Sequence, residues 1–146
     1  MNKLITEFIN SKRFAIVGIS RNNAKFGNIL YRELKSRSFN VIAIHPSLDT
    51  FDGDPCYKTL SEVQPKVDAL IINVGKEQAK TLIEEAHKAS IKQIWLQQGS
   101  ESTETIELAK SYNMNVISGK CILMYAEPVN SIHKFHRFIW KLIKQY

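Results

Sequence analysis

Five short apolar runs, separated by longer stretches, constrain the fold of this chain more than any other feature. Roughly a dozen or more residues lie between one run and the next, and no hairpin turn joins neighbouring runs. Parallel strands need crossovers of this length, and helices usually form them. We therefore predict an α/β fold: a three-layer, Rossmann-like open parallel sheet of five strands in the order 3-2-1-4-5, with flanking helices. The predicted strands are Arg13–Gly18, Asn40–Ile44, Val67–Val74, Gln93–Gln97 and Asn115–Ser118.

The stretches between these strands repeat apolar residues at helical spacing. Residues 77–89 show this clearly, because Ala79, Leu82 and Ile83 fall on one helix face. Residues 47–55 differ, since they are rich in Asp, Gly and Pro, and they predict a loop. The predicted helices cover residues 2–11, 26–36 and 77–89, a segment that begins at Ser102, and a C-terminal stretch over residues 128–146.

Length and composition are those of an ordinary globular domain. The chain has 146 residues, of which 44% are hydrophobic and 23% charged. We predict a single domain over residues 1–146, with its core over about 13–121 and an added helix over about 128–146. No apolar run approaches the ~20 residues that span a bilayer. The N-terminus lacks the apolar core and cleavage site of a signal peptide, which predicts a cytoplasmic protein with no membrane partner.

The two cysteines lie far apart in the sequence. Cys56 and Cys121 show no CxxC spacing, so neither a disulfide framework nor a zinc site is predicted, and no metal is expected. Cys121 follows the last strand beside Lys120, a cation that can lower a thiol pKa. It is therefore either a small buried hydrophobic residue or a reactive thiol that forms a mixed disulfide with a ligand thiol.

The net charge of +6 is spread unevenly along the chain. Residues 1–37 carry eight Lys and Arg against two acids, residues 38–119 carry seven against eleven, and residues 120–146 carry five against one. A nucleic-acid partner is not expected, because a uniformly basic footprint and aromatic–basic interleaving are both missing from the sequence. Phosphate-bearing small molecules account for the basic first loop. The basic tail reads as the outer face of an amphipathic helix, whose broad apolar face packs on the sheet or forms a homodimer.

The stretch Phe14–Gly27 has the pattern of a phosphate-binding loop. An apolar strand breaks at Gly18 into a polar, basic loop, and a helical pattern follows at once. This arrangement points backbone N–H groups and a helix N-terminus at an anionic ligand. Arg21 and Lys25 suit charge-assisted contacts to phosphate, although both also fit an ordinary solvated loop.

In an open parallel sheet, ligands bind beyond the carboxyl ends of the strands, and we place the site at the switch point between the first and fourth strands. Small, polar and turn-forming residues gather at all five ends. His45, beside a proline, is either directed at the ligand or a hydrogen-bonded turn residue. The five ends are Gly18-Ile19-Ser20, Ile44-His45-Pro46, Asn73-Val74-Gly75, Gln97-Gln98-Gly99 and Gly119-Lys120-Cys121.

Neither common nucleotide motif is present. Eight residues separate Gly18 from Gly27, which does not match the GxGxxG spacing of a dinucleotide site. The acid that binds the NAD ribose should close the second strand, where this chain has His45. No GK[ST] of a P-loop occurs either.

From Phe14 to Cys121 the sequence resembles the small single-domain CoA-binding proteins, which are similar to the Rossmann-like domain of the succinyl-CoA synthetase alpha subunit. One position departs from the family pattern, which often has Asn where this chain has His45. The matching segments are Ala15-Ile16-Val17-Gly18-Ile19-Ser20, Val41-Ile42-Ala43-Ile44-His45-Pro46, Gly53-Asp54-Pro55-Cys56-Tyr57 before Leu60, Val67-Asp68, Ile94-Trp95-Leu96-Gln97-Gln98-Gly99, and Cys121 after the fifth strand.

The resemblance implies a site for CoA or an acyl-CoA that runs across the strand ends. It implies that Gly18, Ser20 and the loop from Arg21 to Lys25 hold the pyrophosphate. It also implies that His45 and Pro46 border the adenosine, that Val74 lies beside the ligand, and that Gln98, Gly99 and Cys121 line the remaining edge.

Three functions remain open from the sequence. The first, which we favour, is a CoA-binding module without a reaction of its own, because no nucleophile–base pair has a recognisable spacing. The second is a small enzyme, either an NAD(P)-dependent reductase or an acyl transferase that uses Cys121. The third is a regulatory module whose basic tail contacts a partner.

Overall fold

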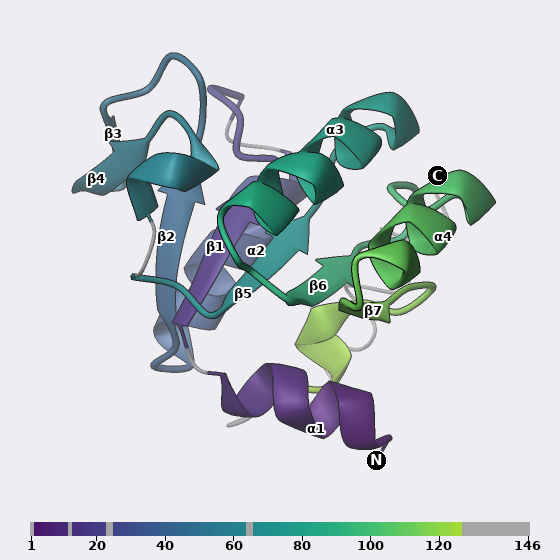
Figure 1. Ribbon diagram of the computed structural model, residues 1–146. Coiled ribbons are helices and arrows are strands. Elements are labelled where there is room, and N and C mark those ends of the chain that lie inside the picture. The colour runs from purple at the N-terminus through teal and green to yellow at the C-terminus, as the bar shows by residue number, and fades with distance from the viewer. Residues whose placement is uncertain (1, 12, 23–24, 64–65, 127–146) are drawn as a thin grey trace.

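A seven-stranded sheet lies at the centre of the computed structural model, which describes residues 2–11, 13–22, 25–63 and 66–126 (Figure 1). The helix predicted over residues 128–146 lies outside these residues. The sheet order is β3-β4-β2-β1-β5-β6-β7, and every pair is parallel except β3 with β4. The strands are β1 Arg13–Val17, β2 Asn40–Ile44, β3 Thr50–Phe51, β4 Asp54–Tyr57, β5 Ala69–Ile72, β6 Gln93–Leu96 and β7 Asn115–Ile117.

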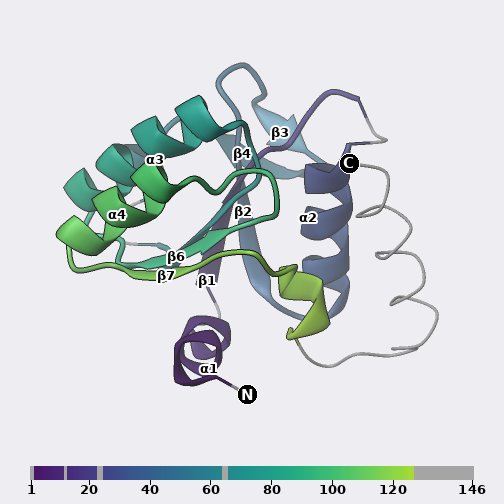
Figure 2. The same cartoon turned by 90° about the vertical axis from the view of Figure 1, so that its right-hand side faces the viewer.

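Helices cover both faces of the sheet, so the predicted three-layer class is confirmed. Figure 2 shows α3 and α4 on one face, and α2 with the short turn η2 on the other. Within β1, Phe14 and Ile16 pack towards α2, whereas Ala15 and Val17 pack towards α3, as the alternation of a strand requires. The helical elements are α1 Lys3–Asn10, α2 Phe26–Ser36, α3 Lys76–Lys88 and α4 Thr103–Ser111, with 3₁₀ turns η1 Leu60–Val63 and η2 Ile122–Met124.

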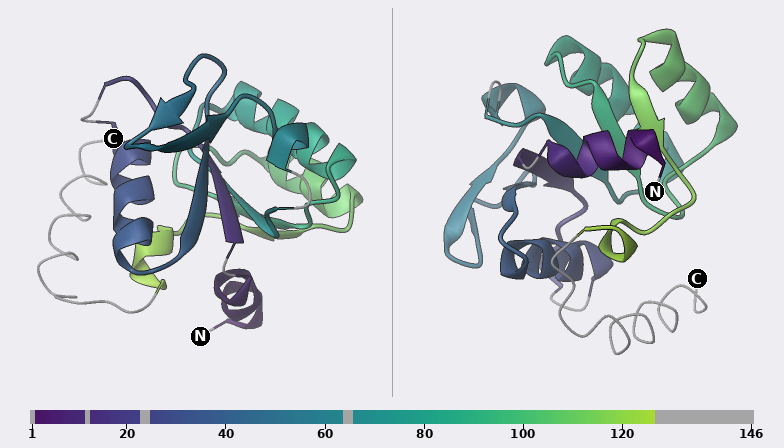
Figure 3. Two further views of the ribbon diagram at one scale, coloured as in Figure 1. Left: turned by 90° about the vertical axis from the view of Figure 1, so that its left-hand side faces the viewer. Right: turned by 90° about the horizontal axis from the view of Figure 1, so that it is seen from below.

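The N-terminal helix packs across the sheet end opposite the loops that follow β1 and β2 (Figure 3, right). The Phe8 ring of α1 stacks on Phe14 at 5.3 Å between ring centroids, and it meets Trp95 edge-on at the same separation. All three side chains are fully buried. Such aromatic pairs stabilise by about 0.5–1.5 kcal/mol beyond their buried area, so α1 is part of the core.

The strand order differs from the predicted 3-2-1-4-5. The run predicted as the third strand forms β5, and it pairs with β1 rather than with β2. The position beside β2 is taken by β4, from the segment predicted as a loop, with the two-residue β3 outside it (Figure 3, left). The reason is that β4 is only four residues long and carries Pro55, a residue without an N–H that argues against a strand. A strand of this kind has neither an apolar run nor a strict alternation in its sequence.

The register of the sheet places four strand ends side by side. Val17 at the end of β1 pairs with Ile44 of β2 and with Ile72 of β5, and Ile72 pairs with Leu96 of β6. The residues after these strands therefore leave the sheet at one level. The switch point lies between β1 and β5, which is the third predicted strand, and not between the first and fourth strands as predicted.

Across the described part of the chain, no helix combines the length and apolar character needed to cross a membrane.

Candidate functional site

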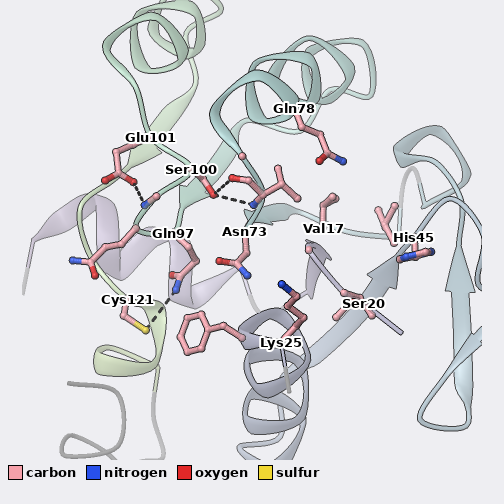
Figure 4. A pocket seen from close by; sticks show the side chains of 18 of the residues that line it. Val17, Ser20, Lys25, His45, Asn73, Gln78, Gln97, Ser100, Glu101 and Cys121 are labelled. Carbon is pink, nitrogen blue, oxygen red and sulfur yellow. Dashed lines mark hydrogen bonds between the residues drawn. The ribbon is translucent and has the colours of Figure 1, made fainter. Parts of the chain in front are cut away.

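A pocket of about 900 Å³ lies at the carboxyl ends of β1, β2, β5 and β6 (Figure 4). All of the predicted site residues line it except Arg21. Phe26, Gln78, Ser100 and Glu101 also line it and were not predicted; they belong to the helix starts and to the loop that precedes α4. The lining comprises Val17, Gly18, Ile19, Ser20, Lys25, Phe26, Ile44, His45, Pro46, Asn73, Val74, Gly75, Gln78, Gln97, Gln98, Gly99, Ser100, Glu101 and Cys121.

The two glycines of the first loop meet in space although eight residues separate them. A Cβ on Gly27 would overlap the Gly18 carbonyl oxygen and lie 2.6 Å from the Gly18 carbonyl carbon. Gly18 has φ +134°, and a Cβ there would lie 2.9 Å from the Asn73 Cβ. The pair therefore performs two tasks of the dinucleotide-site glycines, the sharp turn and the close packing of helix on strand, at a wider spacing.

Asn28, in the first turn of α2, holds the loop in place. Its fully buried side chain accepts from the Ser20 N–H at 2.8 Å and donates to the Ser20 carbonyl at 2.8 Å and the Asn22 carbonyl at 3.2 Å. The Ser20 Oγ accepts from the Asn22 N–H at 3.1 Å. Because these backbone groups of Ser20 and Asn22 are bonded within the protein, the described part of the loop has its shape without a ligand. A polar residue directly after a glycine in an amphipathic helix is the signal that could have identified Asn28.

Two helices begin at the pocket without a side-chain cap. The N-cap residues are Lys25 for α2 and Gly75 for α3, and neither makes a side-chain capping bond. In contrast, α4 is capped by Ser102, whose side chain accepts from the Thr105 N–H at 3.1 Å. Lys25 and Gln78 extend into the pocket from the starts of α2 and α3 (Figure 4). Free N–H groups at a helix start, with the positive end of its dipole, favour an anion.

Side chains clamp the backbone on the opposite side of the pocket as well. The buried Ser100 Oγ accepts from the Val74 N–H at 2.9 Å and donates to the Val74 carbonyl at 2.6 Å. The buried Gln97 accepts from the Ile122 N–H at 3.0 Å. Gln98 donates to the Gly119 carbonyl at 3.3 Å. These bonds join the ends of β5, β6 and β7 into one rigid wall.

A hydrogen-bonded network of Arg21, Ser47 and His45 links the first loop to the end of β2. An Arg21 Nη2 donates to the Ser47 Oγ at 3.2 Å and lies 3.5 Å from the Ser47 carbonyl. The His45 Nδ1 accepts from the Ser47 N–H at 3.1 Å and lies 3.3 Å from the Ser47 Oγ. Partial burial and, next, the charge of Arg21 lower the pKa of His45. The ring is therefore neutral at pH 7, with its proton on Nε2.

Cys121 is a buried member of the pocket wall. The residue is 5% exposed, and its Sγ accepts from the Gln97 Nε2 at 3.5 Å. Burial raises the pKa of this thiol, against smaller lowering effects from Gln97, the Leu123 backbone and Arg37. Lys120 is not among these causes. Of the two interpretations of Cys121, the geometry thus favours a small buried hydrophobic residue over a reactive thiol.

We expect Cys121 to react slowly in the folded protein, because alkylation requires the thiolate and burial disfavours it. Iodoacetamide labelling at pH 7.5, followed by peptide mass spectrometry, should be far slower for the native protein than for the same protein in urea. If Cys121 is labelled as fast in the native protein as in urea, the thiol is activated, and that result would favour the acyl-transfer alternative.

A family model described as a CoA binding domain matches residues 12–127. The chain belongs to this family. The resemblance that its sequence shows to small CoA-binding proteins is thereby confirmed, and so is the Rossmann-like class of its fold.

Relatives of two sizes match the chain. An acetate–CoA ligase (ADP-forming) of Methanocaldococcus jannaschii is 28% identical over 127 residues, which are 82% of this chain but 18% of the ligase. The chain thus spans about a fifth of that relative's length. An uncharacterized protein of Bacillus subtilis, YneT, is 25% identical over 112 residues, 77% of this chain and 83% of YneT. A conserved hypothetical protein from Pyrococcus furiosus is similar in structure, with a TM-score of 0.73 and 33% identity over 75% of this chain and 95% of that one.

Proposed function

We propose that this protein binds coenzyme A or an acyl-CoA in the pocket at the strand ends, without catalysing a reaction of its own. The observation that carries the proposal is the pocket between two uncapped helix starts, with Lys25 at one of them, in a chain of the CoA-binding domain family. The ligand is an elongated molecule with a pyrophosphate between its adenosine and its pantetheine arm.

The pocket has the size and chemistry for such a ligand. Its volume of about 900 Å³ is at the upper end of the roughly 300–1,000 Å³ of small-molecule sites. The start of α2, with Lys25, lines the pocket and suits the pyrophosphate. A Cβ on Gly75 or Gly99 would meet no atom within 4 Å. The bare backbone at these two glycines leaves room for a narrow, amide-containing arm.

The described lining residues also support binding without catalysis. Glu101 is the only carboxylate among them, and it accepts from the Gly99 N–H at 3.0 Å. The Cys121 thiol faces the Gln97 amide, which cannot take its proton. A nucleophile with a base in hydrogen-bond reach is the minimum for acyl transfer, and this lining does not supply one.

A thermal-shift series tests the proposal. A ligand at about 100 times its Kd stabilises a protein by roughly 2.7 kcal/mol, which is roughly 5–10 °C for a domain of this size. CoA or acetyl-CoA should raise the Tm by such an amount, and NAD and ATP by less. A shift with NADH or NADPH, and none with CoA, would contradict the proposal and favour the reductase alternative.

A matched pair of lysine variants tests the location of the site. Lys25→Gln removes a cation from the pocket and should weaken CoA binding roughly tenfold, as the loss of one charge-assisted contact does. Lys92→Gln removes the same charge just before β6, at the amino ends of the strands, and should leave the affinity within about twofold of the wild type. Equal losses in both variants, measured by calorimetry, would place the ligand elsewhere.

A further inference from the structure

Charge is divided between the two sides of the pocket. The sheet order places the ends of β2 and β1 on one side, β5 in the middle and β6 on the other. Lys25, the only Lys or Arg among the described lining residues, belongs to the loop after β1, whereas Glu101, their only Asp or Glu, belongs to the loop after β6. In Figure 4 the two side chains enter from different walls. The pocket is therefore suited to a ligand whose anionic part lies on the β1 side and whose other end carries no negative charge.

The β6 side of the pocket holds polar groups that bond other parts of the protein. A carboxylate that leaves water needs donors in exchange. The donors on this side are directed at protein acceptors, so an incoming carboxylate would meet Glu101 instead. The bonds run from the Ser100 hydroxyl to the Val74 carbonyl at 2.6 Å, from the Gln97 amide to the Cys121 Sγ at 3.5 Å, from the Gln98 amide to the Gly119 carbonyl at 3.3 Å, and from the Gly99 N–H to the Glu101 carboxylate at 3.0 Å.

No cation of the described residues forms an ion pair with Glu101. The ion pairs in that part of the chain join other residues, and Lys120, which precedes Cys121, does not belong to the pocket lining. The Gly99 N–H that bonds Glu101 is a neutral donor. A second carboxylate beside Glu101 would therefore meet like charge in a partly desolvated pocket, where the repulsion is stronger than in water.

We propose that Glu101 restricts the acyl group of the ligand to uncharged ones, so that the protein selects CoA thioesters of monocarboxylic acids over those of dicarboxylic acids. This inference rests on the proposed function, which assigns the pyrophosphate to Lys25 and the start of α2, and the arm to the bare backbone of Gly75 and Gly99. The end of β6 lies two strands from that of β1, or roughly 10 Å, and the extended arm spans this distance. The acyl group on the sulfur at the end of the arm then lies on the side of Glu101.

Calorimetry with butyryl-CoA and succinyl-CoA isolates the charge, because the two acyl chains have the same number of carbons and end in a methyl group or a carboxylate. At pH 7 the wild type should bind butyryl-CoA roughly tenfold or more tightly than succinyl-CoA. This ratio should shrink as NaCl is added, since salt screens the repulsion. Glu101→Gln should bring the two affinities to within about threefold of each other, mainly by strengthening succinyl-CoA binding. The amide oxygen of glutamine can still accept from the Gly99 N–H.

Glu104→Gln is the matched control for this variant. Glu104 lies in the first turn of α4, its side chain is 76% exposed and pairs with Lys80 at 3.5 Å, and it does not belong to the pocket lining. Loss of its charge should preserve the preference for butyryl-CoA. Equal binding of the two thioesters by the wild type, or an unchanged preference in Glu101→Gln, would overturn the inference while free CoA still binds. Binding of neither thioester nor free CoA would overturn the proposed function together with it.

Discussion

A Gly27→Ala variant is expected to lose about 2–3 kcal/mol of stability, although alanine is the better helix former. The new Cβ would overlap the Gly18 carbonyl oxygen and lie 2.6 Å from its carbon. Both are backbone atoms of the strand-to-loop turn and cannot rotate away, so α2 must shift off β1. Overpacking of this kind costs about 1–3 kcal/mol or more, and it exceeds the gain of up to about 1 kcal/mol from helix propensity.

Urea unfolding and CoA titration check this prediction together. The Tm should fall by roughly 5–10 °C, and CoA binding should weaken because the loop that begins at Gly18 moves with the turn. Gly75→Ala is the matched control, since its Cβ meets no atom within 4 Å and its φ is not positive. Its effect on stability should stay within about 1 kcal/mol, the scale of an N-cap change. A Gly27→Ala protein as stable as the wild type would show that the helix and strand do not touch at this point.

An Arg37→Met variant is expected to lose about 3 kcal/mol or more. The Arg37 side chain is 3% exposed and pairs with Glu33 at 3.0 Å. Its Nη1 donates to the Leu123 carbonyl at 2.8 Å and the Ala126 carbonyl at 2.7 Å. Methionine fills much of the volume, yet it leaves two carbonyls and a carboxylate without these partners. Removing one member of a buried ionic contact costs about 3–5 kcal/mol.

The neighbouring Lys35 provides the control for this variant. Lys35 pairs with Asp54 at 3.0 Å, but both side chains are about 40% exposed. Surface pairs contribute about 0–1 kcal/mol, so Lys35→Met should change the urea midpoint little. Arg37→Met should also weaken CoA binding, because Arg37 holds η2, which directly follows Cys121 in the pocket wall. Similar losses of stability in the two variants would show that the burial of Arg37 does not account for its contribution to stability.

Short-range patterns in the sequence were enough to locate most of the elements. The predicted helix 26–36 and strand 40–44 coincide with α2 and β2. The fully buried strand predicted around Val67–Val74 is the fully buried β5, Ala69–Ile72. These signals are local, because a strand buried on both faces is continuously apolar and a helix repeats every three to four residues. The placement of the site at the strand ends followed from the parallel sheet itself.

The errors fall where the sequence carries no local signal. The strand β4 is specified by its place between β3 and β2, where its backbone pairs with Ala43 and Ile44 of β2. Neither Pro55 nor the flanking Asp54 favours a strand. Missing β4 also placed the segment that forms β5 on the wrong side of β1. The ligand contact of Arg21 stays a prediction; in the structure its guanidinium lies against Ser47, since a long side chain on a loop bonds whichever acceptor the fold brings near.

Composition and periodicity alone therefore specified a parallel α/β sheet and the sheet end at which the pocket lies, because both depend on residues close together in the chain. Contacts between distant segments specified the rest. The meeting of Gly27 with Gly18, the Asn28 clamp on Ser20 and the Ser47 hydroxyl between Arg21 and His45 exist only once α2 and β2 have packed beside β1. Those contacts give the described part of the basic loop its shape, and they do so because hydrogen bonds and steric fit act over a few ångströms of space, whatever the separation along the chain.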